Sequence, residues 1–67
     1  MLKNRLKVLR AEKEITQQQL SELVGVSRQT INSIEKNKYI PSTLLSLKLS
    51  KIFEVSVNEI FFISHDE

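Results

Sequence analysis

Residues 16–35 have the sequence TQQQLSELVGVSRQTINSIE, and this pattern predicts two short helices joined by a tight turn. Thr16 is a typical N-cap, and Gln19 three residues later completes a capping box, so the first helix is expected over about residues 17–24. Gly25 accepts the left-handed backbone that a sharp turn requires. Ser27 is the next N-cap, and it places the second helix at about residues 28–36.

The small and apolar residues of this stretch have the spacing of a helix-turn-helix motif. The two helices of such a motif cross closely, so the residue at the crossing must be small, and Ser21 is. Apolar residues must seal the crossing, and those at the right spacing are Leu20, Val24, Val26, Ile31 and Ile34. Leu23 of the first helix is expected to be buried as well. The pattern therefore predicts a helix-turn-helix over about residues 17–36.

The N-terminal segment predicts a helix in front of this motif. Leu2, Leu6 and Leu9 recur at the i, i+4, i+7 spacing of one helix face, and basic residues stand between them. A helix with a basic outer surface is therefore expected over about residues 3–13.

Two more helices are expected after Pro41. Ser42 caps a helix at about residues 43–53, which is so apolar around its girth that we expect it to be buried on more than one side. Ser56 caps a short helix at about residues 57–61. The count of helices in the chain is then five.

The last apolar residues extend beyond the fifth helix. Residues 61–64 are expected to be extended and to pair with Met1–Lys3. The sequence thus predicts an all-α fold of five helices with a small terminal two-stranded β element.

Length and composition indicate one folded domain over residues 1–67. Hydrophobic residues make up 40% of the chain, and a disordered segment would have fewer. The absence of cysteine excludes disulfides and thiolate metal sites, and it suits a reducing cytoplasm. No apolar run approaches the ~20 residues of a membrane span, and no signal-peptide pattern stands at the start. A cytoplasmic location is therefore expected.

Charge is distributed unevenly along the chain. Residues 1–41 carry eight Lys and Arg against four Glu, and residues 42–67 carry two Lys against four acidic residues. Such asymmetry suits a first half that binds a polyanion and a second half that faces solvent or a partner. Ordinary variation of surface charge explains it equally well.

The central stretch resembles the Cro/lambda-repressor-like (XRE) helix-turn-helix family. The resemblance is carried by Ile15–Leu20, Gly25–Ile31 and Ile34–Glu35, and Pro41–Ser42 fits it as well. It implies a five-helix, lambda-repressor-like DNA-binding domain whose third helix enters the major groove of double-stranded DNA. The chain departs from the family at Ile34, where Trp is frequent, and at Asn37, where Gly is frequent. Asn tolerates the left-handed backbone, so Asn37 is expected to adopt it at the end of the second helix of the motif.

The resemblance also implies roles for individual residues. Gln17 falls where the family contacts a phosphate, and Arg10 and Glu35 fall where it has a structural ion pair. The residues at base-reading positions are Arg28, Gln29, Thr30 and Ser33.

The chemistry of the same residues supports a DNA surface independently. Arg pairs with the O6 and N7 atoms of guanine, and Gln pairs with adenine. Uncharged helix starts leave backbone N–H groups that suit phosphates. Lys36, Lys38 and Tyr39 suit either a flanking phosphate or solvent. The candidate DNA-binding residues are Gln17, Ser27, Arg28, Gln29, Thr30, Asn32, Ser33, Lys36, Asn37, Lys38 and Tyr39.

A symmetric homodimer on a palindromic operator is expected, because two copies about 34–36 Å apart occupy successive major grooves. The C-terminal half has more apolar residues than one small core needs, which indicates an interface at Ile40, Leu44, Val57 and Ile60. The alternative is that these side chains fill the core of one copy.

The residue inventory excludes an enzyme. The chain has no cysteine nucleophile or glycine-rich phosphate loop, and the single histidine, His65, lacks partners for catalysis or metal binding. No metal and no cofactor are therefore expected. The function predicted is sequence-specific DNA binding as a transcriptional regulator, a repressor. The alternative is an antitoxin-like protein-interaction module with the same fold.

Overall fold

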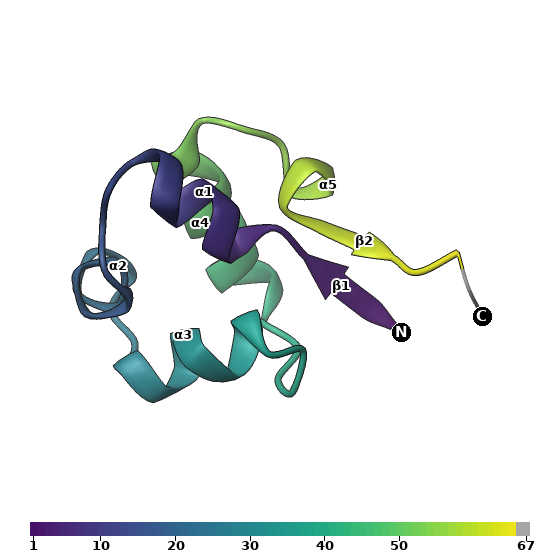
Figure 1. The fold of residues 1–67 in the computed structure, drawn as a ribbon, viewed down its shortest axis with the longest axis horizontal. Helices are drawn as coiled ribbons and strands as arrows, with labels where there is room; N and C mark the ends of the chain where they lie inside the picture. The colour runs from purple at the N-terminus through teal and green to yellow at the C-terminus, as the bar shows by residue number, and fades with distance from the viewer. Residues whose placement is uncertain (66–67) are drawn as a thin grey trace.

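The computed structural model describes residues 1–65 of the chain, in which five helices surround one hydrophobic core and a small sheet lies at one end (Figure 1). The elements in chain order are β1 (Leu2–Asn4), α1 (Leu6–Glu12), α2 (Gln17–Val24), α3 (Arg28–Glu35), α4 (Thr43–Phe53), α5 (Val57–Ile60) and β2 (Phe61–Ile63). The predicted all-α fold with a terminal two-stranded β element is confirmed. None of these helices is long and apolar enough to cross a lipid bilayer.

The helix bounds after residue 16 follow from local capping. The Gln19 N–H donates to Thr16 Oγ1 at 3.0 Å, and the Thr16 N–H donates to Gln19 Oε1 at 2.8 Å, which is the predicted capping box. Ser42 accepts from the Leu45 N–H at 3.1 Å and starts α4 in the same way. Gly25 ends α2 at a φ of 78°, and nothing lies within 4 Å of where a Cβ would stand. Glycine is needed there for its backbone freedom and not for space.

The first helix differs from the prediction, because α1 begins at Leu6 and not near residue 3, whereas the predicted strand at the start of the chain is present. The backbone of Leu2–Asn4 pairs antiparallel with Phe61–Ile63, and Leu2 stands opposite Ile63. Asn4 then ends the strand, and its Oδ1 accepts from the Leu6 N–H at 3.0 Å. Of the three leucines whose spacing indicated one helix, Leu2 therefore lies in the strand and Leu6 and Leu9 lie in α1, and all three pack in or against the same core.

The core contains residues from every helix and from β2. Its buried apolar residues are Leu6, Leu9, Leu20, Val24, Ile31, Ile34, Leu45, Leu49, Phe53, Ile60 and Phe61. Two expectations about burial are wrong. Leu23 on α2 is 61% exposed, and Leu47 on α4 is 56% exposed. The helix α4 is thus buried on one face only, because no other element of residues 1–65 covers the side that carries Leu47.

Candidate nucleic-acid interface

The crossing of α2 and α3 sets α3 at the edge of the molecule. Ser21 is buried where the two helices meet, and its hydroxyl donates to the Gln18 carbonyl oxygen at 2.7 Å. Ile31 and Ile34 attach the inner side of α3 to the core. The outer side of α3 is left open along the lower edge of the view in Figure 1. A side chain on that outer side is therefore presented on a rigid support.

The predicted DNA-binding residues lie around this outer side. Exposed ones are Ser27, Arg28, Gln29, Lys36, Asn37, Lys38 and Tyr39, and half-buried ones are Gln17, Thr30, Asn32 and Ser33. One open hollow of about 310 Å³ brings several of them together, and its lining residues are Ser27, Gln29, Thr30, Ser33, Lys38 and Tyr39. The hydroxyl oxygens of Ser27 and Thr30 are 3.0 Å apart, and the Thr30 N–H donates to Ser27 at 3.1 Å.

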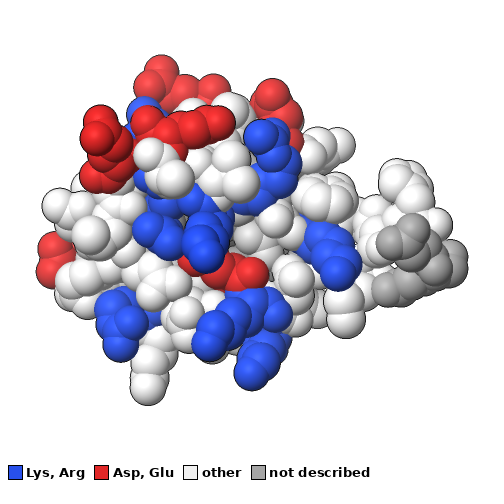
Figure 2. Space-filling view, in the orientation of Figure 1, with Lys and Arg blue, Asp and Glu red and all other residues white. Residues whose placement is uncertain are grey.

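Positive charge gathers on the same edge. Figure 2 shows Lys and Arg along the lower edge, where α3 and the loop after it run in Figure 1, whereas Asp and Glu gather mainly at the upper edge. The single acidic residue of α3, Glu35, points inward and is paired with Arg10. The exposed charges of α3 and its exit loop are therefore cationic, which favours an anionic ligand.

Arg10 and Glu35 form a nearly buried ion pair that joins α1 to α3. Arg10 Nε lies 2.6 Å from Glu35 Oε2, and Arg10 Nη2 donates to Glu35 Oε1 at 3.1 Å. The side chains are only 14% and 5% exposed. Arg10 Nη1 also donates to the Ile15 carbonyl oxygen at 3.0 Å, so the guanidinium also holds the segment just before α2. The hydrogen bond with Glu35 raises the pKa of Arg10.

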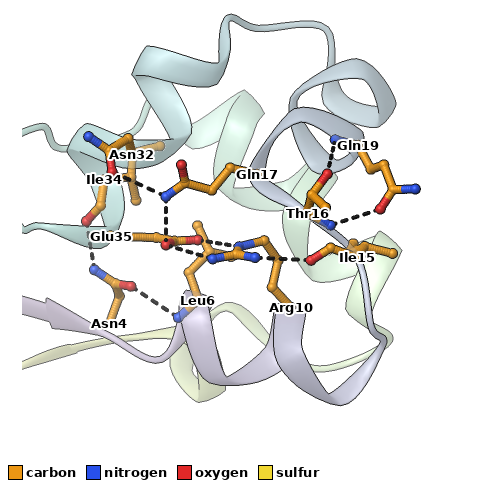
Figure 3. Close-up of polar contacts among 10 residues, drawn as sticks. All are labelled: Asn4, Leu6, Arg10, Ile15, Thr16, Gln17, Gln19, Asn32, Ile34 and Glu35. Atoms are coloured by element: carbon orange, nitrogen blue, oxygen red, sulfur yellow. Dashed lines mark hydrogen bonds and ion pairs between the residues drawn. The ribbon is translucent and has the colours of Figure 1, made fainter.

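Gln17 points into the molecule at this ion pair. Its Nε2 donates to Asn32 Oδ1 at 3.2 Å and to Glu35 Oε1 at 3.1 Å (Figure 3). The residue thus links the first turn of α2 to the middle and the end of α3.

Asn37 ends α3 in the left-handed conformation predicted for it, with a φ of 61°. Its N–H donates to the Ile34 carbonyl oxygen at 2.9 Å, and its Oδ1 accepts from Asn4 Nδ2 at 2.9 Å. Asn4 donates to the Ile34 carbonyl oxygen at 2.8 Å too. Sequence reasoning missed Asn4, because an Asn ahead of a helix looks like an ordinary cap and its distant partners, Ile34 and Asn37, are 30 and 33 residues away.

Comparison with known proteins identifies the family. The model of the helix-turn-helix family matches residues 6–60 of the chain. The chain belongs to the Cro/lambda-repressor-like (XRE) helix-turn-helix family. An uncharacterized HTH-type transcriptional regulator of Methanocaldococcus jannaschii is 48% identical over 66 residues, which cover 98% of this chain and 100% of that protein. The uncharacterized HTH-type transcriptional regulator YgzD of Bacillus subtilis is 43% identical over 65 residues, with 97% and 98% covered.

Two solved structures have the same XRE fold. A Bacteroides fragilis protein, named as a candidate DNA-binding protein, has a TM-score of 0.82 and 34% identity and covers 92% of this chain and 100% of its own. The restriction-modification controller protein C.AhdI of Aeromonas hydrophila has a TM-score of 0.73 and 28% identity, with 81% and 82% covered.

The four residues expected at an interface between copies of this XRE protein do not form one patch. Ile60 is fully buried because α5 packs on α4, so its assignment to an interface is wrong. Ile40 lines one hollow and Val57 another, and both hollows include Leu2 of the small sheet. Leu44 is exposed but lines a third hollow, beside the turn between α2 and α3.

No group of acidic, histidine or cysteine side chains that could hold a metal ion occurs within residues 1–65 of this XRE protein.

Proposed function

We propose that this chain is a sequence-specific DNA-binding transcriptional regulator that inserts α3 into the major groove and acts as a repressor in the cytoplasm. The observation that carries the proposal is the outer side of α3, where cationic and hydrogen-bonding side chains stand on a helix fixed by the core and by the Arg10–Glu35 ion pair. The names of the two relatives, both HTH-type transcriptional regulators, support it.

Specific roles follow from the chemistry of each side chain. Arg28 and Gln29 are both exposed at the start of α3, where they suit the hydrogen-bonding edges of guanine and adenine. Ser33 lies on the same side one turn later. Lys36, Lys38 and Tyr39 suit the phosphates beside the groove, and phosphate contacts add affinity without sequence information.

Repression is the proposed outcome because it requires only occupation of an operator. Activation requires in addition a contact with the transcription machinery. A regulator bound across a promoter excludes that machinery whatever its other surfaces do.

The working form that we propose is a homodimer on a palindromic operator, joined at the small sheet. The backbone N–H of Ser64 donates to the Met1 carbonyl oxygen at 2.9 Å. Hydrogen-bonded and non-hydrogen-bonded residue pairs alternate along an antiparallel ladder, so the neighbouring residue Ile63 directs its own N–H and C=O away from β1. The strand β2 is uncharged, and Ile63 is 72% exposed beside the partly buried Val57. An exposed apolar strand edge can pair with another strand, and an antiparallel pair of identical strands is symmetric by construction.

The position of the sheet also suits a second copy of this chain. Figure 1 shows it at one end of the long axis, so a two-fold axis there leaves both α3 helices uncovered. The longest extent of the molecule is 33 Å, close to the ~34–36 Å between successive major grooves. Val57, which lines one hollow with Ile63, stays in this proposed interface, whereas Ile40, Leu44 and Ile60 do not.

A selection of bound duplexes from a random DNA pool tests the proposal. We expect an enriched site with two inverted half-sites, and binding that weakens steeply as the salt concentration rises. Absence of affinity for any duplex, together with tight binding of a protein partner, would instead establish the antitoxin-like interaction module.

A further inference from the structure

We propose that Gln17 is a positioning residue. Its hydrogen bonds to Glu35 and to Asn32 fix the orientation of the Asn32 amide, so that Asn32 presents its amide N–H groups to the base edges. The inference rests on the proposed function, because it concerns how α3 would read a base. It replaces the phosphate contact expected of the Gln17 side chain.

First, the carboxylate of Glu35 sets the orientation of the Gln17 amide. The carboxylate of Glu35 is held by two hydrogen bonds from Arg10, and its Oε1 accepts a further one from Gln17 at 3.1 Å. An ionised carboxylate can only accept hydrogen bonds. Gln17 must therefore turn its NH₂ group, and not its carbonyl oxygen, toward Glu35.

The second step is the use of both Gln17 hydrogens. One N–H of Nε2 reaches Glu35, and the other reaches Asn32 Oδ1 at 3.2 Å. The side chain then has no donor left for a phosphate, and its free oxygen is an acceptor that an anionic phosphate disfavours. Any phosphate at the start of α2 is left to the backbone N–H groups of its first turn.

The third step is the orientation of Asn32. Its Oδ1 is bound to Gln17, so Nδ2 occupies the opposite side of the amide, and Figure 3 shows that nitrogen pointing away from Gln17. Asn32 follows Arg28 by four residues on the same helix and is half-buried, which limits its alternative rotamers. The side chain is thus fixed as a donor on the surface proposed to meet DNA.

Because the NH₂ group of Asn32 faces outward, the side chain should select a base that presents an acceptor. Guanine O6 and N7 and thymine O4 are acceptors in the major groove and match a donor. A two-bond pair with adenine needs an outward oxygen as well, and cytosine presents a donor that would oppose the amide. Asn32 should therefore favour an acceptor base, although a free asparagine would favour adenine.

Replacement of Gln17 separates this positioning role from a phosphate contact. Gln17→Met keeps the length of the side chain and removes its hydrogen bonds, and Gln18→Met is the matched control, because Gln18 is exposed and donates to Glu22. We expect Gln17→Met to lose discrimination at one base pair by on the order of 5- to 100-fold and to bind random DNA as the parent does. An equal loss on specific and random DNA would establish the phosphate contact and overturn the proposal.

The reciprocal change tests the direction of the effect. Asn32→Asp keeps an oxygen for Gln17 and turns a second oxygen outward, so preference at the same base pair should move toward cytosine, whose amino group donates. A loss of binding without any change in base preference would count against Asn32 as the reader.

A measurement without DNA keeps the two proposals distinguishable. In the free protein, Gln17→Met should shift the side-chain NH₂ resonances of Asn32 in a ¹⁵N–¹H spectrum, and Gln18→Met should leave them in place. Unchanged Asn32 resonances in a folded Gln17→Met variant would overturn the inference even if DNA binding is found. A parent chain that binds no duplex overturns the proposed function, while the Asn32 resonances still decide whether Gln17 orients that side chain.

Discussion

At the scale of single residues, Asn37 contributes to the fold through both its backbone conformation and a side-chain hydrogen bond. It adopts the left-handed conformation that ends α3, and its side chain accepts a hydrogen bond from Asn4 in β1. Glycine meets the first requirement at no steric cost, but it cannot meet the second. The exit loop that carries Lys38 and Tyr39 is thereby held against the sheet.

Substitutions at Asn37 separate the contribution of its left-handed backbone from that of its side-chain hydrogen bond. We expect Asn37→Gly to stay within about 1 kcal/mol of the parent in free energy of unfolding, because an easier backbone offsets one lost exposed hydrogen bond. Asn37→Val should cost more, on the order of 1–3 kcal/mol, since a β-branched residue is strained at positive φ. Denaturant unfolding measures both. A valine variant as stable as the glycine variant would show that the left-handed backbone is not maintained.

Arg28 and Lys38 should separate specificity from affinity. Arg28→Ala is expected to cost roughly 1–3 kcal/mol of specific binding and to relax the preference at one base pair, as for a lost two-bond contact with guanine. Lys38→Ala should weaken all sequences alike and reduce the salt slope by about one unit. Titrations of specific and random duplexes at several salt concentrations measure both effects. Identical behaviour of the two variants would contradict the assigned roles.

At the scale of elements, the Arg10–Glu35 ion pair orders three helices at once. Arg10 lies on α1, Glu35 ends α3, and Gln17 at the start of α2 donates to the same carboxylate. Removing one partner of such a pair leaves the other nearly buried without its counter-charge. The resulting loss in free energy of unfolding is larger than the net contribution of the intact pair to stability.

Glu35→Ala should therefore destabilise the fold by an amount approaching the ~3–5 kcal/mol of a fully buried pair. Glu22→Ala is the control, because Glu22 is exposed on α2. Thermal and denaturant unfolding compare the two variants. Equal midpoints for Glu35→Ala and the parent would show that the ion pair adds nothing to stability.

The pH dependence of this contribution follows from Arg10. Its pKa is raised in the folded state by the hydrogen bond with Glu35, so the stabilisation is fully present below the ordinary pKa of arginine. It is lost only as the pH rises through the raised value. We therefore expect the difference in unfolding free energy between the parent and Arg10→Met to be constant from pH 7 to pH 10. A marked decline within that range would indicate a different cause of the stabilisation.

At the scale of the whole molecule, the basic surface and the small sheet lie apart. The exposed cationic residues of the proposed DNA surface, Arg28, Lys36 and Lys38, belong to α3 and the loop after it, whereas Phe62 and Ile63 are exposed on β2 at the end of the long axis. This separation allows one surface to meet DNA while the other meets a second copy.

Substitution of Ile63 tests the proposed interface between copies. Ile63→Lys places a charge on the outer edge of β2 and should convert a dimer to a monomer in sedimentation at micromolar concentration. Leu47→Lys is the matched control, since Leu47 is 56% exposed on α4 and lies outside the interface. A parent that sediments as a monomer and binds a palindromic site would refute this dimer.

Local signals alone determined the helix-turn-helix of this protein. The caps at Thr16, Ser27 and Ser42 and the left-handed turn at Gly25 involve residues close in sequence, so the bounds of α2 and α4 were predictable without knowledge of distant contacts. The left-handed Asn37 was predictable for the same reason.

Only the tertiary structure decided which apolar and polar side chains face inward. Leu23 and Leu47 are exposed while Ile60 is buried, because the periodicity of a helix marks an apolar face but not which neighbour covers it. The pairing of the first residues with β2 was predicted, but only the tertiary structure shows that the strand runs to Asn4 and that α1 begins at Leu6 instead of near residue 3. The amide of Gln17 turns inward because the carboxylate of Glu35, which lies on another helix, accepts from it.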